Sequence, residues 1–257
     1  MTYWLIVPFS RPTFYQDVLA NHARQELQNT RLLFVCNREA RGFRGNHGTF
    51  IESVDGLAEP MNAGLAYARQ HGKPGDWFCK WDDDDYYGPK FLVDVQKGKE
   101  LGAGVVGKFA VWIRISNDRL WFLDAPQDRW FADQEPHGPT LAGPLDCADF
   151  PHRDHWGEDT AWVRLMREAG HRVWLGPARS FCWKRYGKEH SHAFPFTDLA
   201  LAGMQTYPVL DTGMVFGSDR DHVDNRSIAP FWSAVVKPSV EEFAKEAFDI
   251  PLMRDPV

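Results

Sequence analysis

Four consecutive aspartates, Asp82 to Asp85, form the densest group of reactive side chains in this sequence. They directly follow a short apolar segment, Trp77 to Trp81, which is typical of a buried strand. Adjacent carboxylates repel one another, and a divalent cation with its preference for oxygen ligands relieves that repulsion. Because alternate side chains of an extended segment face opposite ways, we expect one or two direct ligands. The other aspartates would contact ribose or orient waters.

A second pair of acids, Glu158 and Asp159, follows Gly157 and opens a predicted helix that runs to Ala169 before Gly170. Taken alone, these carboxylates could simply stabilise the positive end of the helix dipole. A third group, His190 and His192, could place two imidazoles on one side of a strand, although such pairs are usually solvent-exposed.

The elements that would position these groups begin with a strand at Trp4 to Val7, closed by Pro8. A helix follows, with Pro12 in its first turn, and a second strand is predicted at Leu32 to Cys36. A strand, helix and strand in this order form a βαβ unit, whose ligands bind outside the carboxyl ends of the strands. The first candidate site is therefore Pro8 to Arg11 together with Asn37 and Arg38.

The rest of the pattern continues this alternation and predicts an α/β fold. Residues 39–55 lack periodicity and are predicted to be a loop, whose glycines do not match a phosphate-binding fingerprint. Further helices are expected at 57–68, from Phe91 onward and at 239–248. Further strands are expected at 105–107, 109–115, 120–122, 173–175 and 181–183, with a loop or short strand at 138–143.

The composition is that of an ordinary globular protein. The 257 residues include 29 Lys and Arg against 35 Asp and Glu, which gives a formal net charge of −6 and argues against a nucleic-acid interface. No segment is apolar enough to predict a membrane span. The four cysteines are far apart and show no CxxC motif, so buried thiols in a reducing cytoplasm are expected.

The order of the segments resembles that of the GT-A fold glycosyltransferases, most closely glycosyltransferase family 2. The matching segments are WLIVPFSRP, LLFVCN, EPMNAGLAYA, WDDDDYYGPKFL and WGEDTAWVRLMREAG. The resemblance implies a Rossmann-like three-layer α/β/α sandwich with a mixed central sheet. It implies a catalytic domain over residues 1–192, with a nucleotide-sugar half (1–100) and an acceptor half (101–192). Residues 193–257 would be an extension of unknown role packed on the same domain.

The resemblance also implies a nucleotide-sugar donor, most readily a UDP-sugar, beside the first βαβ unit. Its base and ribose would lie near Pro8, Ser10, Arg11 and Asn37. The family usually has an aspartate where this chain has Asn37, but an amide can still bond the edge of a uracil or thymine. Asn62 matches a family asparagine near the donor.

The same resemblance assigns the acids. Asp84 and Asp82 would bind Mn²⁺ or Mg²⁺, with Asp82 and Asp83 also contacting the donor, and His192 matches an additional metal ligand of some members. Asp159 matches the catalytic base, with Glu158 as its neighbour. Inversion requires a carboxylate on the sugar face opposite the leaving diphosphate, and the metal would stabilise the charge on that leaving group.

The predicted function is thus an inverting, metal-dependent glycosyltransferase of the hexosyltransferase type, with a glycan or other hydroxyl acceptor. One alternative is a sugar-1-phosphate nucleotidyltransferase, although the loop PFSRPTF lacks the glycines of that class. Another is a Ca²⁺-dependent carbohydrate-binding protein without catalysis. The sequence does not indicate the donor sugar, the acceptor or the oligomeric state.

Overall fold

The structure is a computed structural model that describes residues 1–257 except 116–118, 124–126, 132–134, 154–156, 186–205 and 212–257. The chain divides into two compact units. The first comprises Met1–Val111 and Ala125–Trp183, and the second comprises Trp112–Asp124 and Lys184–Val257. The expected boundary at residue 192 and the helix expected at 239–248 lie outside the described residues.

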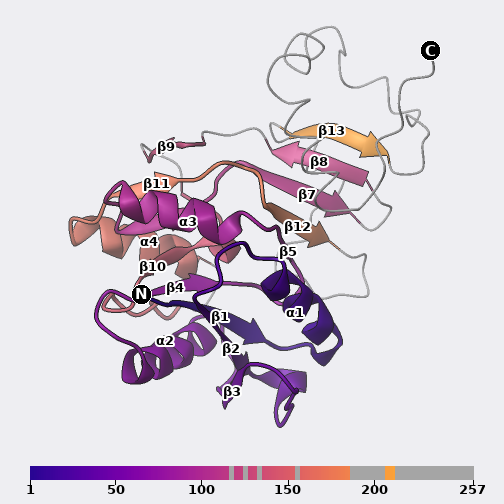
Figure 1. Cartoon of the computed structure of the whole chain (residues 1–257), viewed down its shortest axis with the longest axis vertical. Helices are drawn as coiled ribbons and strands as arrows, with labels where there is room; N and C mark the ends of the chain where they lie inside the picture. The colour runs from indigo at the N-terminus through magenta and orange to yellow at the C-terminus, as the bar shows by residue number, and fades with distance from the viewer. Residues whose placement is uncertain (116–118, 124–126, 132–134, 154–156, 186–205, 212–257) are drawn as a thin grey trace, which may run out of the picture. The chain divides into compact units, whose positions relative to one another are not determined.

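The first unit is built on a mixed eight-stranded sheet with the order β3-β2-β1-β4-β10-β6-β11-β9 (Figure 1). Strands β1, β2, β3 and β4 run parallel, and β10 is antiparallel to both of its neighbours, β4 and β6. The strands are β1 (Tyr3–Phe9), β2 (Thr30–Cys36), β3 (Thr49–Glu52), β4 (Trp77–Lys80), β6 (Val105–Gly107), β9 (Arg129–Trp130), β10 (Ala142–Pro144) and β11 (Val173–Leu175). A short strand pair in this unit joins β5 (Tyr86–Tyr87) to the start of β12 (Phe181–Arg185).

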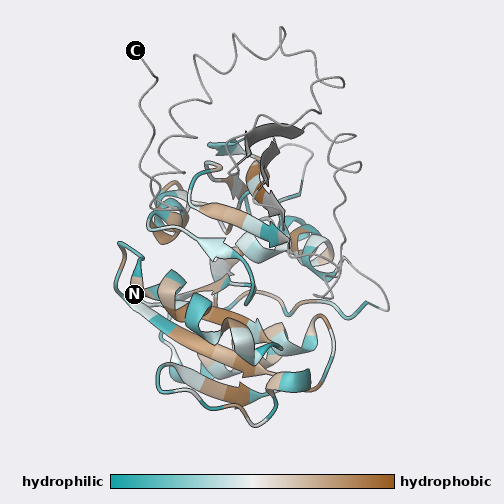
Figure 2. Ribbon diagram, turned by 90° about the vertical axis from the view of Figure 1, so that its right-hand side faces the viewer, coloured by the Kyte–Doolittle hydropathy of each residue, from teal (hydrophilic) through white to brown (hydrophobic). Residues whose placement is uncertain are grey.

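Helices cover both faces of this sheet, which gives the expected three layers. The helices are α1 (Tyr15–Ala23), α2 (Glu59–His71), α3 (Phe91–Glu100) and α4 (Glu158–Glu168). Side chains of α2 and α4 share one apolar core with Ile6, Phe78 and Val105 of the strands. On α3, Gly98 packs against Val106 and Trp174. Because successive side chains of a strand point to opposite faces of the sheet, Val106 lies on the other face from Val105, and α3 covers that face. Figure 2 shows brown, apolar stretches along several of the strands.

Close helix packing explains one glycine of this layer. A Cβ at Gly64 of α2 would lie 2.4 Å from Cγ2 of Ile6 and 3.1 Å from Cγ2 of Val35. Any larger residue would therefore push α2 away from β1 and β2.

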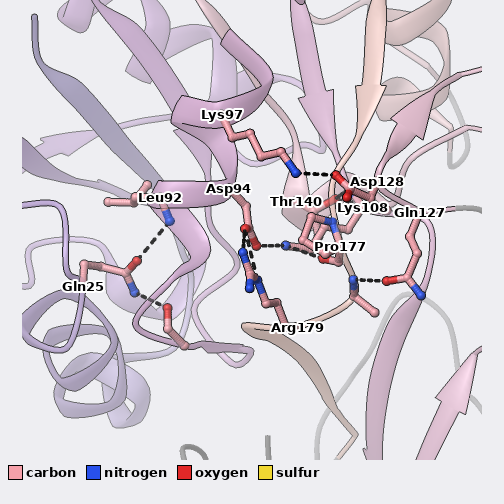
Figure 3. Close-up of polar contacts among 12 residues, drawn as sticks. Gln25, Leu92, Asp94, Lys97, Lys108, Gln127, Asp128, Thr140, Pro177 and Arg179 are labelled. Atoms are coloured by element: carbon pink, nitrogen blue, oxygen red, sulfur yellow. Dashed lines mark hydrogen bonds and ion pairs between the residues drawn. The ribbon is translucent and has the colours of Figure 1, made fainter. Parts of the chain in front are cut away.

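A buried ion pair ties α3 to the segment after β6 (Figure 3). Nζ of Lys108 lies 2.8 Å from Oδ2 of Asp94 and donates to the Pro177 carbonyl at 2.6 Å. Arg179 donates from Nη2 to the other Asp94 oxygen at 3.0 Å. Burial lowers the pKa of Lys108 against the opposing effect of Asp94.

In the second unit, β8 (Arg119–Leu123) pairs antiparallel with β13 (Thr206–Asp211) and has β7 (Val111–Ile115) on its other side. The strands expected at 109–115 and 120–122 are thus confirmed within two residues. Strand β13 was not expected. The expected extension over residues 193–257 stays a prediction, because most of that range is outside the described part of the chain.

The prediction for residues 39–55 was wrong in part. This stretch contains a 3₁₀ turn, η2 (Arg38–Ala40), and β3, which pairs in parallel with β2 from Leu33↔Thr49 to Cys36↔Glu52. Strand β3 has only four residues, none of them buried, so its alternation is too short and too weakly apolar to stand out.

Two further expectations concern thiols and membranes. All four cysteines are buried and free, and burial raises the pKa of Cys36 and Cys147 to about 11. These thiols are therefore protonated and unreactive near neutral pH.

Within the described ranges, none of the helices has the length and apolar character needed to cross a bilayer.

Candidate active site

The carboxyl ends of β1, β2 and β4 meet at one edge of the sheet. Phe9 of β1 pairs with Cys36 of β2, and Ile6 pairs with Lys80, the last residue of β4. The segments after these strands therefore start beside one another, as expected for a ligand-binding edge.

Asp83 joins two of these segments. Its carboxylate accepts the backbone N–H groups of Ser10 and Arg11 at 3.1 and 3.2 Å and pairs with the Arg11 guanidinium. Arg11 also lies 3.0 Å from Oδ2 of Asp84. Burial raises the pKa of Asp83 to about 6 despite the opposing effect of Arg11. Arg11 thus neutralises part of the aspartate run and holds the loop after β1 in place.

The other three aspartates, Asp82, Asp84 and Asp85, form a compact cluster. One carboxylate oxygen from each lies within 4.8 Å of the others, and Asp84 and Asp85 are buried. Residues 83–85 form a turn, which directs Asp83 toward Arg11 and brings the remaining carboxylates together. Our expectation of an extended segment was wrong for this reason, and Asp85 joins the predicted pair Asp82 and Asp84.

This donor set fits a divalent cation. Three carboxylate oxygens at mutual distances below 4.8 Å suit the oxygen coordination of Mg²⁺, Mn²⁺ or Ca²⁺. The expected additional ligand, His192, lies outside the described residues and stays a prediction.

Asp159 lies at the start of α4 and pairs with a lysine that we did not single out from the sequence. Its Oδ2 is 2.6 Å from Nζ of Lys80, and the side chains are 20% and 8% exposed. Its Oδ1 is buried without a hydrogen-bond partner in the described part of the chain. Burial raises the pKa of Asp159 to about 6, with Lys80 opposing and Glu158 adding to the rise.

Gly138 encloses the same carboxylate from another side. A Cβ at this position would lie 1.8 Å from Oδ2 of Asp159, so no other residue fits without moving the acid. Gly138 begins the 3₁₀ turn η3 (Gly138–Thr140), which runs beside β4 because the N–H of Lys80 donates to the Leu141 carbonyl at 2.8 Å.

Glu158, the neighbour of Asp159, is buried, and its carboxylate binds the backbone just before α4. The N–H of Gly157 donates to Oε2 of Glu158 at 3.2 Å. Gly157 precedes the helix with a φ of 111°, a conformation that residues with a Cβ rarely adopt.

Tyr87 connects the acidic cluster to η3. Its hydroxyl accepts the N–H of Asp82 at 2.7 Å and donates to the Pro139 carbonyl at 2.9 Å. The ring is fully buried and stacks on Trp81, with the centroids 4.4 Å apart. Burial raises the pKa of Tyr87, so the hydroxyl keeps the proton that it donates. The Tyr87 hydroxyl therefore connects the backbone at Asp82 to the turn η3 beside Asp159.

The two asparagines expected near the donor have different surroundings. Asn37 follows β2, and its buried Oδ1 has no hydrogen-bond partner among the residues described. Asn62 of α2 exchanges two hydrogen bonds with the backbone of Phe150, at 2.7 and 2.8 Å. Asn62 thus fixes the segment before α4. Pro8 lies in β1 at the same edge as Ser10 and Arg11.

The comparison with solved structures agrees with this architecture. The chain is similar to the crystal structure of S. aureus TarS 1–349 in complex with UDP-GlcNAc, with a TM-score of 0.52 and 18% sequence identity. The match covers 75% of this chain and 60% of that chain. This chain has a GT-A fold. No family model and no curated protein matches it.

Three residues of the site were not predicted from the sequence, because little in their local sequence indicates a functional role: Lys80, Tyr87 and Gly138. Lys80 is a lone charge at the end of an apolar strand, and Tyr87 and Gly138 have ordinary neighbours. Lys80 alone could have been noticed, because a lysine in a buried strand requires a carboxylate partner.

Proposed function

We propose that this protein is an inverting, metal-dependent glycosyltransferase that moves a sugar from a nucleoside-diphosphate sugar to a hydroxyl acceptor. The observation that carries the proposal is Asp159, a partly exposed carboxylate with one oxygen that has no hydrogen-bond partner in the described residues, in a GT-A fold. A carboxylate in this state can accept a proton from a substrate.

In the proposed step, the Asp159 carboxylate takes the proton of the acceptor hydroxyl. The hydroxyl oxygen forms a bond to the anomeric carbon, and the bond between that carbon and the diphosphate oxygen breaks. The diphosphate leaves with the electron pair, and the sugar inverts. Asp159 holds the abstracted proton until solvent removes it.

Asp82, Asp84 and Asp85 would hold the divalent cation. When bound, such a cation supplies positive charge that stabilises a departing diphosphate. Arg11, already paired with Asp83 and Asp84, adds a fixed positive charge at the same strand ends.

The donor is proposed to be a UDP-sugar. The similar protein TarS was crystallised with UDP-GlcNAc, and Oδ1 of Asn37 can accept the N3–H of uracil. Pro8, Ser10 and Arg11 would line the ribose and base, and the transfer would be of the hexosyl type. Four buried free thiols support a reducing compartment such as the cytoplasm.

The test is donor turnover with a panel of sugar nucleotides and Mn²⁺. We expect release of nucleoside diphosphate in the wild type, a fall of about 100- to 10,000-fold in Asp159→Asn and its loss in Asp84→Ala. Asp128→Asn, a change to an exposed aspartate, serves as the control and should keep full turnover. Unchanged turnover in both site variants would refute the assignment.

Calorimetry separates the alternative functions. Binding of UDP that Mn²⁺ strengthens supports the transferase, whereas glycan binding with Ca²⁺ and no nucleotide affinity identifies a carbohydrate-binding protein. Synthesis of a sugar nucleotide from a nucleoside triphosphate and a sugar-1-phosphate would identify a nucleotidyltransferase.

A further inference from the structure

The two oxygens of the Asp159 carboxylate differ in their surroundings. Oδ2 lies 2.6 Å from the Lys80 ammonium and against Gly138, where a Cβ would come within 1.8 Å. Oδ1 is buried and has no hydrogen-bond partner in the described ranges. Leaving a buried acceptor without a partner is energetically unfavourable, so this arrangement of the carboxylate calls for a functional explanation.

Lys80 is placed firmly enough to orient this acid. It ends β4 in the middle of the sheet, its N–H donates to the Leu141 carbonyl at 2.8 Å, and the residue is 6% exposed. The carbonyl that it binds directly follows η3, the turn that contains Gly138. The ammonium and the glycine are therefore fixed relative to each other before any substrate binds.

We propose that Lys80 and Gly138 are positioning residues that hold the Asp159 carboxylate in place for the acceptor hydroxyl. This inference rests on the proposed function. The ammonium anchors one oxygen, and the missing side chain at position 138 leaves room for that pairing. Both contacts restrict the carboxylate to one orientation at the start of α4.

A purely structural ion pair would give different kinetics. Positioning acts through Asp159, so the effects of changing Lys80 and Asp159 should not add. An ion pair that only stabilises the fold would lower thermal stability and leave kcat of the folded protein unchanged.

The experiment is a double-mutant cycle on the full chain with UDP-sugar and Mn²⁺. We expect Lys80→Met to lower kcat by about 10- to 100-fold, a part of the roughly 100- to 10,000-fold that general-base catalysis contributes, with a much smaller change in the donor KM. The double variant Lys80→Met/Asp159→Asn should be no slower than Asp159→Asn alone. Gly138→Ala tests the other side of the carboxylate and should lower kcat without weakening UDP binding.

Lys97→Met is the matched control, because Lys97 forms an exposed pair with Asp128 at 2.7 Å, and its kcat should be unchanged. UDP binding measured by calorimetry establishes that each variant is folded. If Lys80→Met does not fold, Gly138→Ala and its double variant with Asp159→Asn provide the same cycle.

Three results would overturn the inference. Wild-type kcat in folded Lys80→Met and Gly138→Ala would exclude positioning while leaving the transferase intact. Multiplied losses in the double variant would show that Lys80 acts independently of Asp159. Absence of transfer by the wild type, or full activity in Asp159→Asn, would refute the proposed function or its base, and the inference would fall with it.

Discussion

Two of the lysine–aspartate pairs in the described part of the chain have nearly equal length and very different burial. Lys108 and Asp94 lie 2.8 Å apart with side chains that are 3% and 2% exposed. Lys97 and Asp128 lie 2.7 Å apart with side chains that are 48% and 53% exposed. Replacing each aspartate by asparagine therefore compares the loss of a buried carboxylate, which also pairs with Arg179, with the loss of an exposed one.

Asp94→Asn should lower this free energy by about 3–5 kcal/mol, because it leaves the Lys108 ammonium buried without a counter-charge. Asp128→Asn should cost less than about 1 kcal/mol, since water solvates the freed lysine. Asp128 has a φ of 51°, which asparagine also tolerates, so the control introduces no backbone strain.

Urea unfolding followed by tryptophan fluorescence and far-UV circular dichroism measures both changes, provided that the two signals coincide. The loss in Asp94→Asn should shrink between pH 7 and pH 10. Burial holds the pKa of Lys108 in the folded wild type below its unfolded value, and Asp94 opposes that shift. Without Asp94 the folded pKa falls further, so the folded variant loses the proton at a lower pH than the folded wild type and its stability rises more with pH in that window. Equal losses in the two variants, or a loss in Asp94→Asn that does not change with pH, would refute this reasoning.

Three further predictions concern the site. At saturating donor and Mn²⁺, kcat should fall as the pH drops through about 6, because protonated Asp159 cannot accept a proton, and a flat pH profile would contradict this. Tyr87→Phe should lower the free energy of unfolding by about 1–3 kcal/mol, measured by urea titration, because the Asp82 N–H and the Pro139 carbonyl lose their shared partner. Asp85→Asn should weaken Mn²⁺ binding about 10- to 100-fold by calorimetry with UDP present, and unchanged affinity would exclude this carboxylate from the metal site.

Much of the fold follows from local patterns. The apolar run at Tyr3–Phe9 and the periodic stripe of α2 identify their elements because burial dictates their residue types. Strand β3 escapes prediction, since none of its four residues is buried and its pairing with β2 depends on the chain's tertiary course.

The sequence indicated which acidic residues belong to the candidate site, but not how their side chains are arranged in space. Asp82, Asp84 and Asp159 stand out as carboxylates at the ends of predicted elements. The turn that points Asp83 away from the other acids depends on Arg11, 72 residues earlier in the chain. Such a long-range partner leaves no local trace in the sequence.

The pairing of Lys80 with Asp159 also bears on how the protein acquires activity as it folds. The two residues are 79 positions apart, and Gly138 comes from a third segment between them. Contacts over such separations form only after the entropy of closing a long loop has been overcome. A chain emerging from the ribosome can complete β1, β2 and β4 while α4 is still unmade. Its base is therefore added late, and no incomplete chain can carry out the proposed transfer.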